Sequence, residues 1–593
     1  MSADAANVSD VGWDLEPLLA GGTTDDLLDE ADREANRLAE QRGQVASFSA
    51  ADLARFMEGL ARVRELVERS ESYTRLSFAT DTADAARGAA MQKVSERATA
   101  ITTTLLFFEL EWAALDDGQA AELLADPGLA AYHHHLRAAR RYRDHLLTEP
   151  EERILAEKAI TGRNAWVRLF DELTSAVEVE LDGAPAGLEE GLSRLSHPDR
   201  EVRRNAAGAV TDGLATGLRT RAFLYNTLLA DKAVDDRLRH YDHWLASWNL
   251  AQEASDESVA ALVAAVHRRY DIPQRWYALK ARLLGVERLA DYDRNAPVAD
   301  DDESFEWDDA RRLVLDCYSS FSPELGQLAE QFFTDRWIDA PLRPAKAPGA
   351  FCAYTVPSAN PYVLVNFTGR RNDVLTLAHE LGHGVHGALA RRQGIFHQST
   401  PLTLAETASV FGETVVLGRL LGEATSPRAR LSLLAGSVDG AIATVFRQTA
   451  MNRFEHLAHS VRRTEGELSV DRFGELWIET QEEMLGSAVE LTPGYRSWWS
   501  YIPHFIGTPG YVYAYAYGQL LALSVYRRYE ERGSEFVDRY LELLAAGGSD
   551  TPEQLAHIVD CDLADPAFWD GGLAIIDGQL AAAEAAAKDA GLL

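Results

Sequence analysis

The sequence predicts a mainly α-helical protein with little β-structure. Long stretches rich in Ala, Leu, Glu and Arg repeat their apolar residues three and four positions apart, as in residues 51–68 and 89–115, and this spacing marks one face of a helix. The hydrophobic share of 46% and the charged share of 25% are typical of globular proteins. Because 593 residues exceed the roughly 100–200 that one core needs, we expect several packed subdomains or one large fold.

Turn-forming clusters suggest how the chain is divided. Such clusters lie at residues 126–128, 183–187 and 196–199. The last two frame a boundary near residue 195, so we expect an N-terminal helical region over residues 1–195 and a second domain over residues 196–593. Within the second domain, residues 294–303 and 340–349 are expected to be surface loops, and the alanine-rich run 580–588 a solvated terminal helix.

Charge and cysteine content exclude several classes of protein. The net charge of −34 disfavours binding to nucleic acid or to an anionic membrane, since such binders use Lys and Arg to displace counterions. We find no run of 18 apolar residues and an acidic N-terminal stretch, so we expect neither a membrane span nor a secretory signal. Cys317, Cys352 and Cys561 are too few and too far apart for a disulfide framework, which favours a reducing cytoplasm.

The clearest strand candidate is residues 362–367, Tyr-Val-Leu-Val-Asn-Phe, which Pro361 precedes and Gly369 follows. It stands just ahead of the motif described next. We expect a small β-sheet here, and the strand could pair with an extended peptide through main-chain hydrogen bonds.

The segment after this strand contains His379-Glu380-x-x-His383 in a helical context, and we expect Asp373 to be its N-cap. Four residues cover about 400° of helix, so both imidazoles share one face and can reach one zinc ion. Glu380 would stand beside the metal as general base. The alternative is a structural helix with two buried histidines and an accidental Glu.

Three glycines in the same helix argue against that alternative. Gly382, Gly384 and Gly387 each cost about 1 kcal/mol relative to Ala in a helix interior, and a purely structural helix would avoid them. We expect something to approach the helix backbone closely at these positions.

A catalytic zinc site needs a third protein ligand. The metzincin extension would place Gly and His where this chain has His386 and Leu389, so that pattern fails. Glu406 is the better choice, because Thr400 and Pro401 can start a helix and place Glu406 on its second turn. Glu413, seven residues later, could orient a ligand histidine or be an ordinary solvated Glu.

Taken together, these residues resemble the oligoendopeptidase F and thimet oligopeptidase family of zinc peptidases. The specific match covers residues 360–369, 377–386 and 405–409, and weaker similarity to the oligoendopeptidase F branch extends over nearly the whole chain. The resemblance implies one zinc ion held by His379, His383 and Glu406, with Glu380 as general base. It also implies a helical ellipsoid with a deep substrate channel, and a metallopeptidase catalytic domain over residues 196–593.

The family also has a downstream His and tyrosines that bind the substrate carbonyl and the tetrahedral intermediate. Residues 502–518 match this segment, with His504 as the histidine. By helical spacing Tyr511 and Tyr515 share one face, while Tyr513 and Tyr517 lie roughly opposite. We expect Tyr511 and Tyr515 to face the site, and the alternative is that all four pack in the core.

The remaining histidines are weaker candidates. The run 133–135 is expected to be a solvated face, and His456 and His459 lack a third ligand for a metal. For His386, packing or support of a ligand is expected instead of ligation.

The function implied is a zinc-dependent oligoendopeptidase that hydrolyses internal bonds of short unstructured peptides through a zinc-activated water. Two alternatives remain: a dipeptidyl carboxypeptidase on the same fold, which needs an extra positive group, and a non-catalytic helical peptide-binding protein.

Overall fold

The computed structural model describes residues 8–298 and 304–593. Two segments lie outside the described residues. They are residues 1–7, part of the stretch in which no secretory signal is expected, and residues 299–303, part of the expected loop 294–303. Contacts divide the chain into two compact units, each made of three stretches. Unit 1 comprises Met1–Arg143, Asp302–Arg419 and Arg528–Asp562, and unit 2 comprises Asp144–Asp301, Leu420–Arg527 and Leu563–Leu593. The sequence instead predicted two consecutive domains that meet near residue 195. That boundary stays a prediction.

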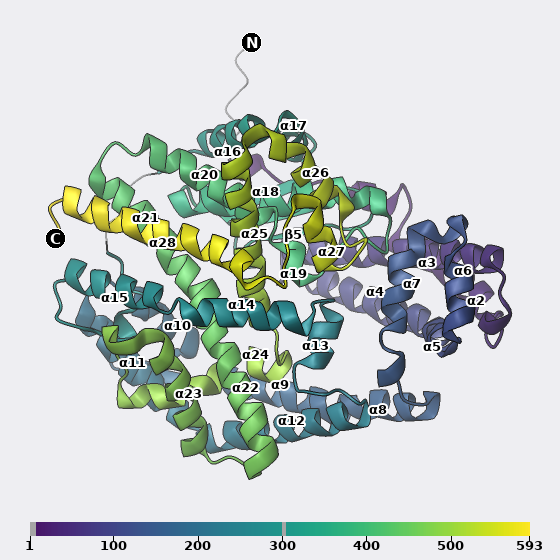
Figure 1. The fold of residues 1–593 in the computed structure, drawn as a ribbon, viewed down its shortest axis with the longest axis horizontal. Coiled ribbons are helices and arrows are strands. Elements are labelled where there is room, and N and C mark those ends of the chain that lie inside the picture. Colours follow the sequence, from purple (N-terminus) through teal and green to yellow (C-terminus); the bar gives the residue numbers. More distant parts are fainter. Residues whose placement is uncertain (1–7, 299–303) are drawn as a thin grey trace. The chain divides into compact units, whose positions relative to one another are not determined.

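Helices dominate both units, which confirms the predicted fold class (Figure 1). Those of unit 1 are α1 (Glu16–Leu19), α2 (Thr24–Ala39), α3 (Ala50–Ala79), α4 (Ala85–Thr104), α5 (Leu106–Ala114), α6 (Asp117–Leu124), α7 (His133–Arg140), α16 (Trp307–Phe321), α17 (Pro323–Thr334), α18 (Arg371–Ala390), α19 (Leu402–Ala405), α26 (Val537–Ala546) and α27 (Pro552–Ala556). Those of unit 2 are α8 (Glu149–Thr161), α9 (Arg163–Ser175), α10 (Leu188–Ser193), α11 (Arg200–Ala215), α12 (Leu218–Leu238), α13 (Ala246–Ala251), α14 (Asp256–Arg268), α15 (Asp271–Leu283), α21 (Pro427–Ala441), α22 (Gln448–Glu465), α23 (Val470–Leu485), α24 (His504–Gly507) and α28 (Pro566–Asp589). The helices α20 (Ser409–Glu423) and α25 (Tyr513–Arg532) each contribute residues to both units.

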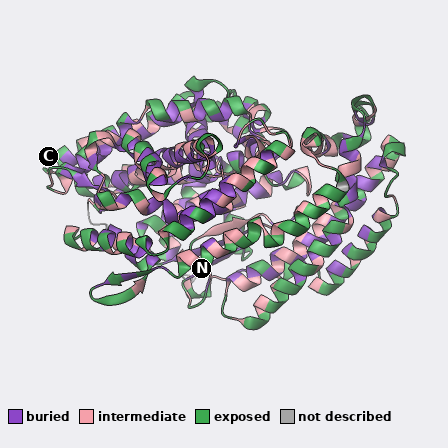
Figure 2. Ribbon diagram, turned by 90° about the horizontal axis from the view of Figure 1, so that it is seen from below, coloured by how far each residue is buried: buried purple, intermediate pink, exposed green. Residues whose placement is uncertain are grey.

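The N-terminal helices show how local sequence sets helix ends. The expected helix over residues 51–68 is α3, which continues to Ala79, and α2 and α4 pack against it. The expected helix over residues 89–115 is two helices, because it breaks at Leu105. The hydroxyls of Thr102, Thr103 and Thr104 all bond to carbonyls four residues earlier, and such bonds bend a helix or compete with its own ladder. In Figure 2 most helices carry a buried stripe and an exposed stripe.

A three-stranded sheet in unit 1 has the order β4-β6-β5, with β4 at Ile338–Pro341, β5 at Phe351–Ala353 and β6 at Tyr362–Phe367. The bounds of β6 are those predicted, and both β5 and β6 pack against α18, so the small sheet beside the motif helix is confirmed. However, β6 is the central strand, parallel to β4 and antiparallel to β5. The expectation that it pairs with a peptide is therefore wrong, since its backbone groups are already used by both neighbours.

Unit 2 contains two small two-stranded sheets and a hydrophobic core that includes many aromatic residues. The sheets pair β1 (Glu178–Leu181) with β2 (Ala184–Gly187) and β3 (Leu289–Ala290) with β7 (Val489–Glu490). The alanine-rich C-terminal run belongs to α28, which packs on α21 and α14. Leu580, Ala583 and Ala587 are fully buried there, so the expected solvated helix is wrong: alanine on a helix permits close packing as readily as exposure.

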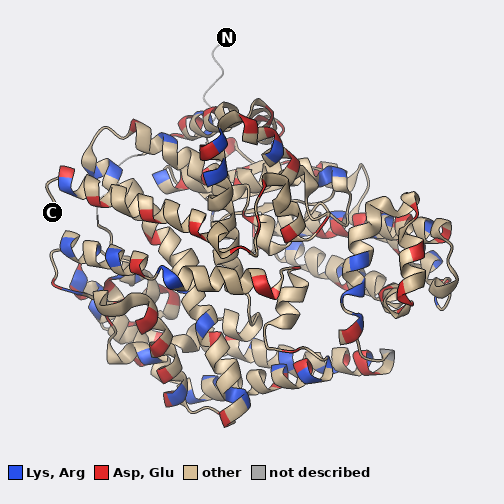
Figure 3. Cartoon of the chain, in the orientation of Figure 1, with Lys and Arg blue, Asp and Glu red and all other residues tan. Residues whose placement is uncertain are grey.

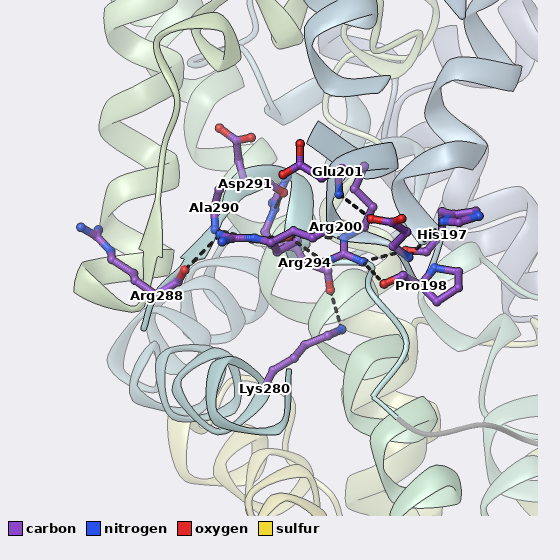
Figure 4. Close-up of polar contacts among 12 residues, drawn as sticks. His197, Pro198, Arg200, Glu201, Lys280, Arg288, Ala290, Asp291 and Arg294 are labelled. Atoms are coloured by element: carbon purple, nitrogen blue, oxygen red, sulfur yellow. Dashed lines mark hydrogen bonds and ion pairs between the residues drawn. The ribbon is translucent and has the colours of Figure 1, made fainter. Parts of the chain in front are cut away.

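The expected surface loop that begins at Arg294 is anchored at its start by buried charges (Figure 4). Lys280 on α15 is fully buried, and its ammonium donates to the Arg294 carbonyl at 2.6 Å and pairs with Asp439 at 2.8 Å. Asp293, also fully buried, pairs with Arg200 at 2.8 Å and Arg203 at 2.9 Å. Buried charges are tolerated only when they are paired in this way.

Acidic and basic residues are interspersed along the helices of both units (Figure 3). By length and composition, one helix in the described part of the chain, Pro427–Glu465, could cross a membrane, and the bent pair Ala85–Ala114 and Asp117–Leu124 passes the same test together. Half of the apolar window of Pro427–Glu465 is buried inside the protein. Core helices of soluble proteins share this composition.

Candidate metal centre

The helix α18 lies within unit 1 against the sheet and against α17 and α26, and it carries His379, Glu380 and His383. The two imidazoles lie one turn apart with ring centroids at 5.0 Å. Asp373 is the third residue of the helix and not its N-cap, because the helix starts at Arg371. Its carboxylate nevertheless accepts the backbone N–H groups of Thr368 and Arg370, which otherwise lack helical partners.

Glu406 occupies a break between two helices. The sequence predicted a helix that carries Glu406 on its second turn. The helix α19 instead has Pro401 as its N-cap, starts at Leu402 and ends after one turn at Ala405, so that expectation is wrong. The hydroxyl of Thr407 donates to the Leu404 carbonyl at 2.7 Å, and that of Ser409, which donates mainly to the Glu406 carboxylate, lies 3.2 Å from the Glu406 carbonyl. Side-chain bonds of this kind compete with the helical ladder. The chain resumes as α20 at Ser409.

The glycines of α18 are explained by close approach, as the sequence predicted. A Cβ at Gly382 would lie 2.5 Å from the Ala408 carbonyl oxygen and 2.5 Å from the Ser409 Cα, so the segment that follows Glu406 runs directly against this glycine. At Gly384 and Gly387 the close neighbours are the rings of Phe332 and Tyr354. Glycine at position 382 therefore lets the Glu406 segment reach the histidines.

His379, His383 and Glu406 come together as one group whose possible ligand atoms all lie within 4.8 Å of one another. A carboxylate oxygen of Glu406 is 3.3 Å from Nε2 of His379 and 3.5 Å from Nε2 of His383. Two ligand atoms at about 2.1 Å from a tetrahedral centre are about 3.4 Å apart, so these spacings fit a zinc-like ion. Within residues 8–298 and 304–593, no other group of three His, Cys, Asp or Glu meets this criterion.

Two further side chains hold the ligands in place. Glu413 on α20 lies 3.2 Å from Nδ1 of His379, so a proton on Nδ1 is donated to Glu413 and Nε2 is left as the ligand atom. The Ser409 hydroxyl donates to the Glu406 carboxylate at 2.6 Å. Sequence reasoning raised Glu413 as one of two alternatives and gave Ser409 no role, although a hydroxyl residue three positions after a candidate ligand is a usable signal.

The electrostatics of the three side chains favour a bound cation. Burial opposes ionisation of Glu406, but the hydrogen bond from His379 and the charge of His383 hold its pKa down to about 2. Burial also disfavours the charged form of His379, yet the hydrogen bonds to Glu406 and Glu413 raise its pKa to about 10. Burial lowers the pKa of His383 to about 4. Ionised Glu406 is thus paired with a protonated imidazole, and a metal ion could replace that positive charge.

Glu380 lies beside the ligands without belonging to their group. It is 7% exposed, and its Oε2 has no hydrogen-bond partner among the described residues. Burial, aided by the negative charge of Glu406 and opposed by His379, raises the pKa of Glu380 to about 7. A carboxyl with this pKa and an unused oxygen suits proton transfer near neutral pH.

A second cluster of predicted site residues lies in unit 2. Nε2 of His504 is 3.2 Å from the Tyr515 hydroxyl, and the His504 ring stacks on Tyr511 with centroids at 5.6 Å. Burial and the charge of Arg447 lower the pKa of His504. Arg447 ends a π-helical segment, Ile442–Arg447, between α21 and α22, and sequence reasoning missed it because such a segment has no sequence signature.

Burial separates the four tyrosines into two pairs. Tyr513 and Tyr517 are fully buried and bond to Asn249 at 2.8 Å and Ser258 at 3.2 Å, while Tyr511 and Tyr515 are partly exposed. The helix α25 begins only at Tyr513, so Tyr511 lies in the preceding turn. Its ring still contacts that of Tyr515, with centroids at 4.9 Å.

The other histidines serve packing. His456 accepts the Trp244 indole N–H at 3.3 Å, and His459 stacks on the same indole at 4.5 Å. The run 133–135 is half-buried, with His135 stacked on Phe396, so the expected solvated face is wrong. His386 is 2% exposed, and its ring faces that of Tyr354 with centroids at 6.1 Å.

Comparison with known proteins places these features in a family. The sequence model described as Peptidase family M3 matches residues 193–575, and that described as Oligopeptidase F matches residues 111–178. The chain is 26% identical over 501 residues to Group B oligopeptidase PepB of Streptococcus agalactiae, covering 82% of this chain and 83% of that one. It is also 26% identical over 547 residues to oligopeptidase PepF of Bacillus subtilis, covering 89% and 80%.

Solved structures share the fold. A crystal structure from Chlamydophila abortus is similar with a TM-score of 0.85 at 21% identity, covering 100% of both chains. Oligoendopeptidase-F from Enterococcus faecium is similar with a TM-score of 0.70 at 22% identity, covering 95% of this chain and 99% of that one. With a family match over most of its length, this chain belongs to peptidase family M3, a family of metallopeptidases, and is a peptide hydrolase.

Proposed function

We propose that this protein is a zinc-dependent oligoendopeptidase that hydrolyses internal bonds of short unstructured peptides. The observation that carries the proposal is the group of His379, His383 and Glu406, with near-tetrahedral spacing and the unpaired carboxyl of Glu380 beside it. Zinc is favoured over harder ions, because two imidazoles and one carboxylate are typical of catalytic zinc sites.

Bound zinc would supply Lewis-acid chemistry, lowering the pKa of water and polarising the scissile carbonyl. Glu380 takes a proton from the attacking water and delivers it to the leaving amine. Glu413 keeps His379 in one tautomer, and Ser409 keeps the Glu406 carboxylate turned toward the histidines. His504, Tyr511 and Tyr515 are assigned to the substrate carbonyl, where their donors would stabilise the oxyanion.

Peptide specificity in this proposal rests on the main chain. With β6 occupied on both sides, the edge strand β5 beside α18 is the segment that can accept an extended peptide. Main-chain pairing tolerates many side chains but requires an unfolded substrate. The cytoplasm is the proposed compartment, since none of the three cysteines forms a disulfide.

The test is peptide cleavage with metal analysis. Purified protein is incubated with a peptide mixture and with a stably folded protein, with and without a chelator, and the products are identified by mass spectrometry. We expect one zinc per chain, internal cuts that the chelator abolishes, and an intact folded protein. Release of C-terminal dipeptides alone would indicate a dipeptidyl carboxypeptidase, and metal binding without cleavage would indicate a binding protein.

The variant His383→Ala should lose the metal. The control His456→Ala removes a histidine that accepts the Trp244 indole N–H and lies outside the ligand group, so it should keep both metal and cleavage. Equal metal content in both variants would exclude His383 as a ligand.

A further inference from the structure

One buried acid in unit 2 has no part in the metal centre. Glu455 on α22 is 0% exposed, and its Oε1 accepts the backbone N–H of Gly510 at 2.9 Å. Its Oε2 has no partner among the described residues, and neither has the buried hydroxyl of Tyr225. A buried carboxyl with one unpartnered oxygen is costly to desolvate, so a purely structural core would favour an apolar side chain here.

The partner of Glu455 is a turn that requires glycine. Gly510 has a φ of +86°, and a Cβ there would lie 2.5 Å from Leu245 Cδ1, so only glycine fits. The next residue, Tyr511, contacts Trp248 at 5.7 Å between centroids, His504 at 5.6 Å and Tyr515 at 4.9 Å. The position of the Gly510 backbone thus determines the position of the Tyr511 Cα, and with it where the Tyr511 ring can lie.

The rest of the tyrosine segment is anchored separately. Tyr513 bonds to Asn249, and Tyr517 bonds to Ser258, so α25 is held in the core without Glu455. Local turn bonds join Tyr511 N to the Thr508 carbonyl at 3.1 Å and Ala514 N to the Tyr511 carbonyl at 2.9 Å. Glu455 ties Gly510 to α22, and Arg163 on α9 donates to the Gly507 carbonyl at 2.6 Å, where the turn begins.

We propose that Glu455 is a positioning residue for the hydrolytic reaction: by holding the Gly510 amide, it orients the Tyr511 hydroxyl toward the substrate carbonyl. The inference rests on the proposed function, because it needs Tyr511 to bind the reacting carbonyl. Glu455 itself does not touch the substrate.

Glutamine is a matched control for this role. Burial raises the pKa of Glu455 to about 8, so the carboxyl is mostly neutral at pH 7, and Gln has the same shape and a carbonyl acceptor. Glu455→Leu keeps similar volume without an acceptor. Glu455→Asp keeps the acid but shortens the side chain by one methylene, so it no longer reaches Gly510.

The experiment compares these three variants in the full-length zinc-loaded protein. Turnover, Michaelis constant, zinc content, melting temperature and amide hydrogen exchange of residues 508–512 are measured. We expect Glu455→Gln to stay within about threefold of the parent, because its carbonyl preserves the bond. Glu455→Leu and Glu455→Asp should lose turnover roughly 10- to 100-fold at unchanged zinc content, with faster exchange in the turn.

A double variant separates positioning from general destabilisation. If Glu455 acts through Tyr511, then Glu455→Leu should add less than about threefold to the loss already caused by Tyr511→Phe. Fully multiplicative losses, or parental turnover in Glu455→Leu or Glu455→Asp, would overturn the inference. If Glu455→Leu does not fold, the turnover of Glu455→Asp tests the inference in its place. An inactive parent would instead refute the proposed function, which the parent's own cleavage assay reveals.

Discussion

Replacing Gly382 with Ala tests how the metal centre is assembled. The new Cβ would lie 2.5 Å from both the Ala408 oxygen and the Ser409 Cα, where ordinary contact begins near 3.4 Å. These are backbone atoms, so no side chain can rotate away, and the segment must move by about 0.9 Å. Because the Ser409 hydroxyl donates to the Glu406 carboxylate, a shift of Ser409 also shifts this metal ligand.

The expected effect follows from the tolerance of zinc sites, whose ligand distances vary by about 0.2 Å. A shift several times larger should weaken zinc binding at least as much as loss of a residue that supports a ligand, roughly 10- to 100-fold. Competition with a chromogenic chelator measures the affinity, and the melting temperature of the metal-free protein shows whether the fold survives.

Two glycines provide controls. Gly418 lies exposed on α20 with nothing within 4 Å of an added Cβ, so Gly418→Ala should stabilise by about 0.5–1 kcal/mol and leave zinc affinity unchanged. Gly384→Ala meets the Phe332 ring, so it should cost about 1–3 kcal/mol of stability without moving Glu406. Parental zinc affinity in Gly382→Ala would refute the argument.

Three further predictions concern single side chains. Glu380→Gln should keep its zinc and lose turnover about 10²–10⁴-fold, because an amide cannot accept the proton; loss of metal would make Glu380 a ligand. Tyr511→Phe or Tyr515→Phe should lower turnover roughly 10²–10³-fold with little change in Michaelis constant or melting temperature. Tyr513→Phe should have a lower melting temperature and stay active. The reverse pattern would assign the oxyanion role to Tyr513 and the packing role to Tyr511 and Tyr515. The pKa of Glu455 is raised from 4.5 to about 8 on folding, so the folded state holds the proton more tightly and stability falls as pH rises between these values. Glu455→Gln should escape this loss, and its stability advantage over the parent should grow by up to roughly 4 kcal/mol from pH 4.5 to pH 8, as melting temperatures across that range would show; a constant difference would mean that Glu455 titrates normally.

Local patterns determined much of this protein. Apolar spacing is a property of neighbouring residues, so it predicted a helical fold, and β-branched composition between Pro361 and Gly369 predicted the bounds of β6. The spacing of His379 and His383 placed both imidazoles on one face of one helix. The cost of Gly382 within that helix predicted a close approach, because glycine is retained in a helix interior only for a reason outside the helix.

Tertiary structure decided what approaches and how. The partner of Gly382 is the backbone at Ala408 and Ser409, and no local pattern contains a contact between residues this far apart. The break at Glu406 depends on whether the hydroxyls of Thr407 and Ser409 bond to nearby protein groups or to solvent. Burial decides this, and it follows from the tertiary structure. Likewise, β6 is central because β4 and β5 pair with it, and Glu455 reaches Gly510 across 55 residues of chain. Residue type and spacing fix which groups can react, but the distances that make them a site come from packing between segments far apart in the sequence.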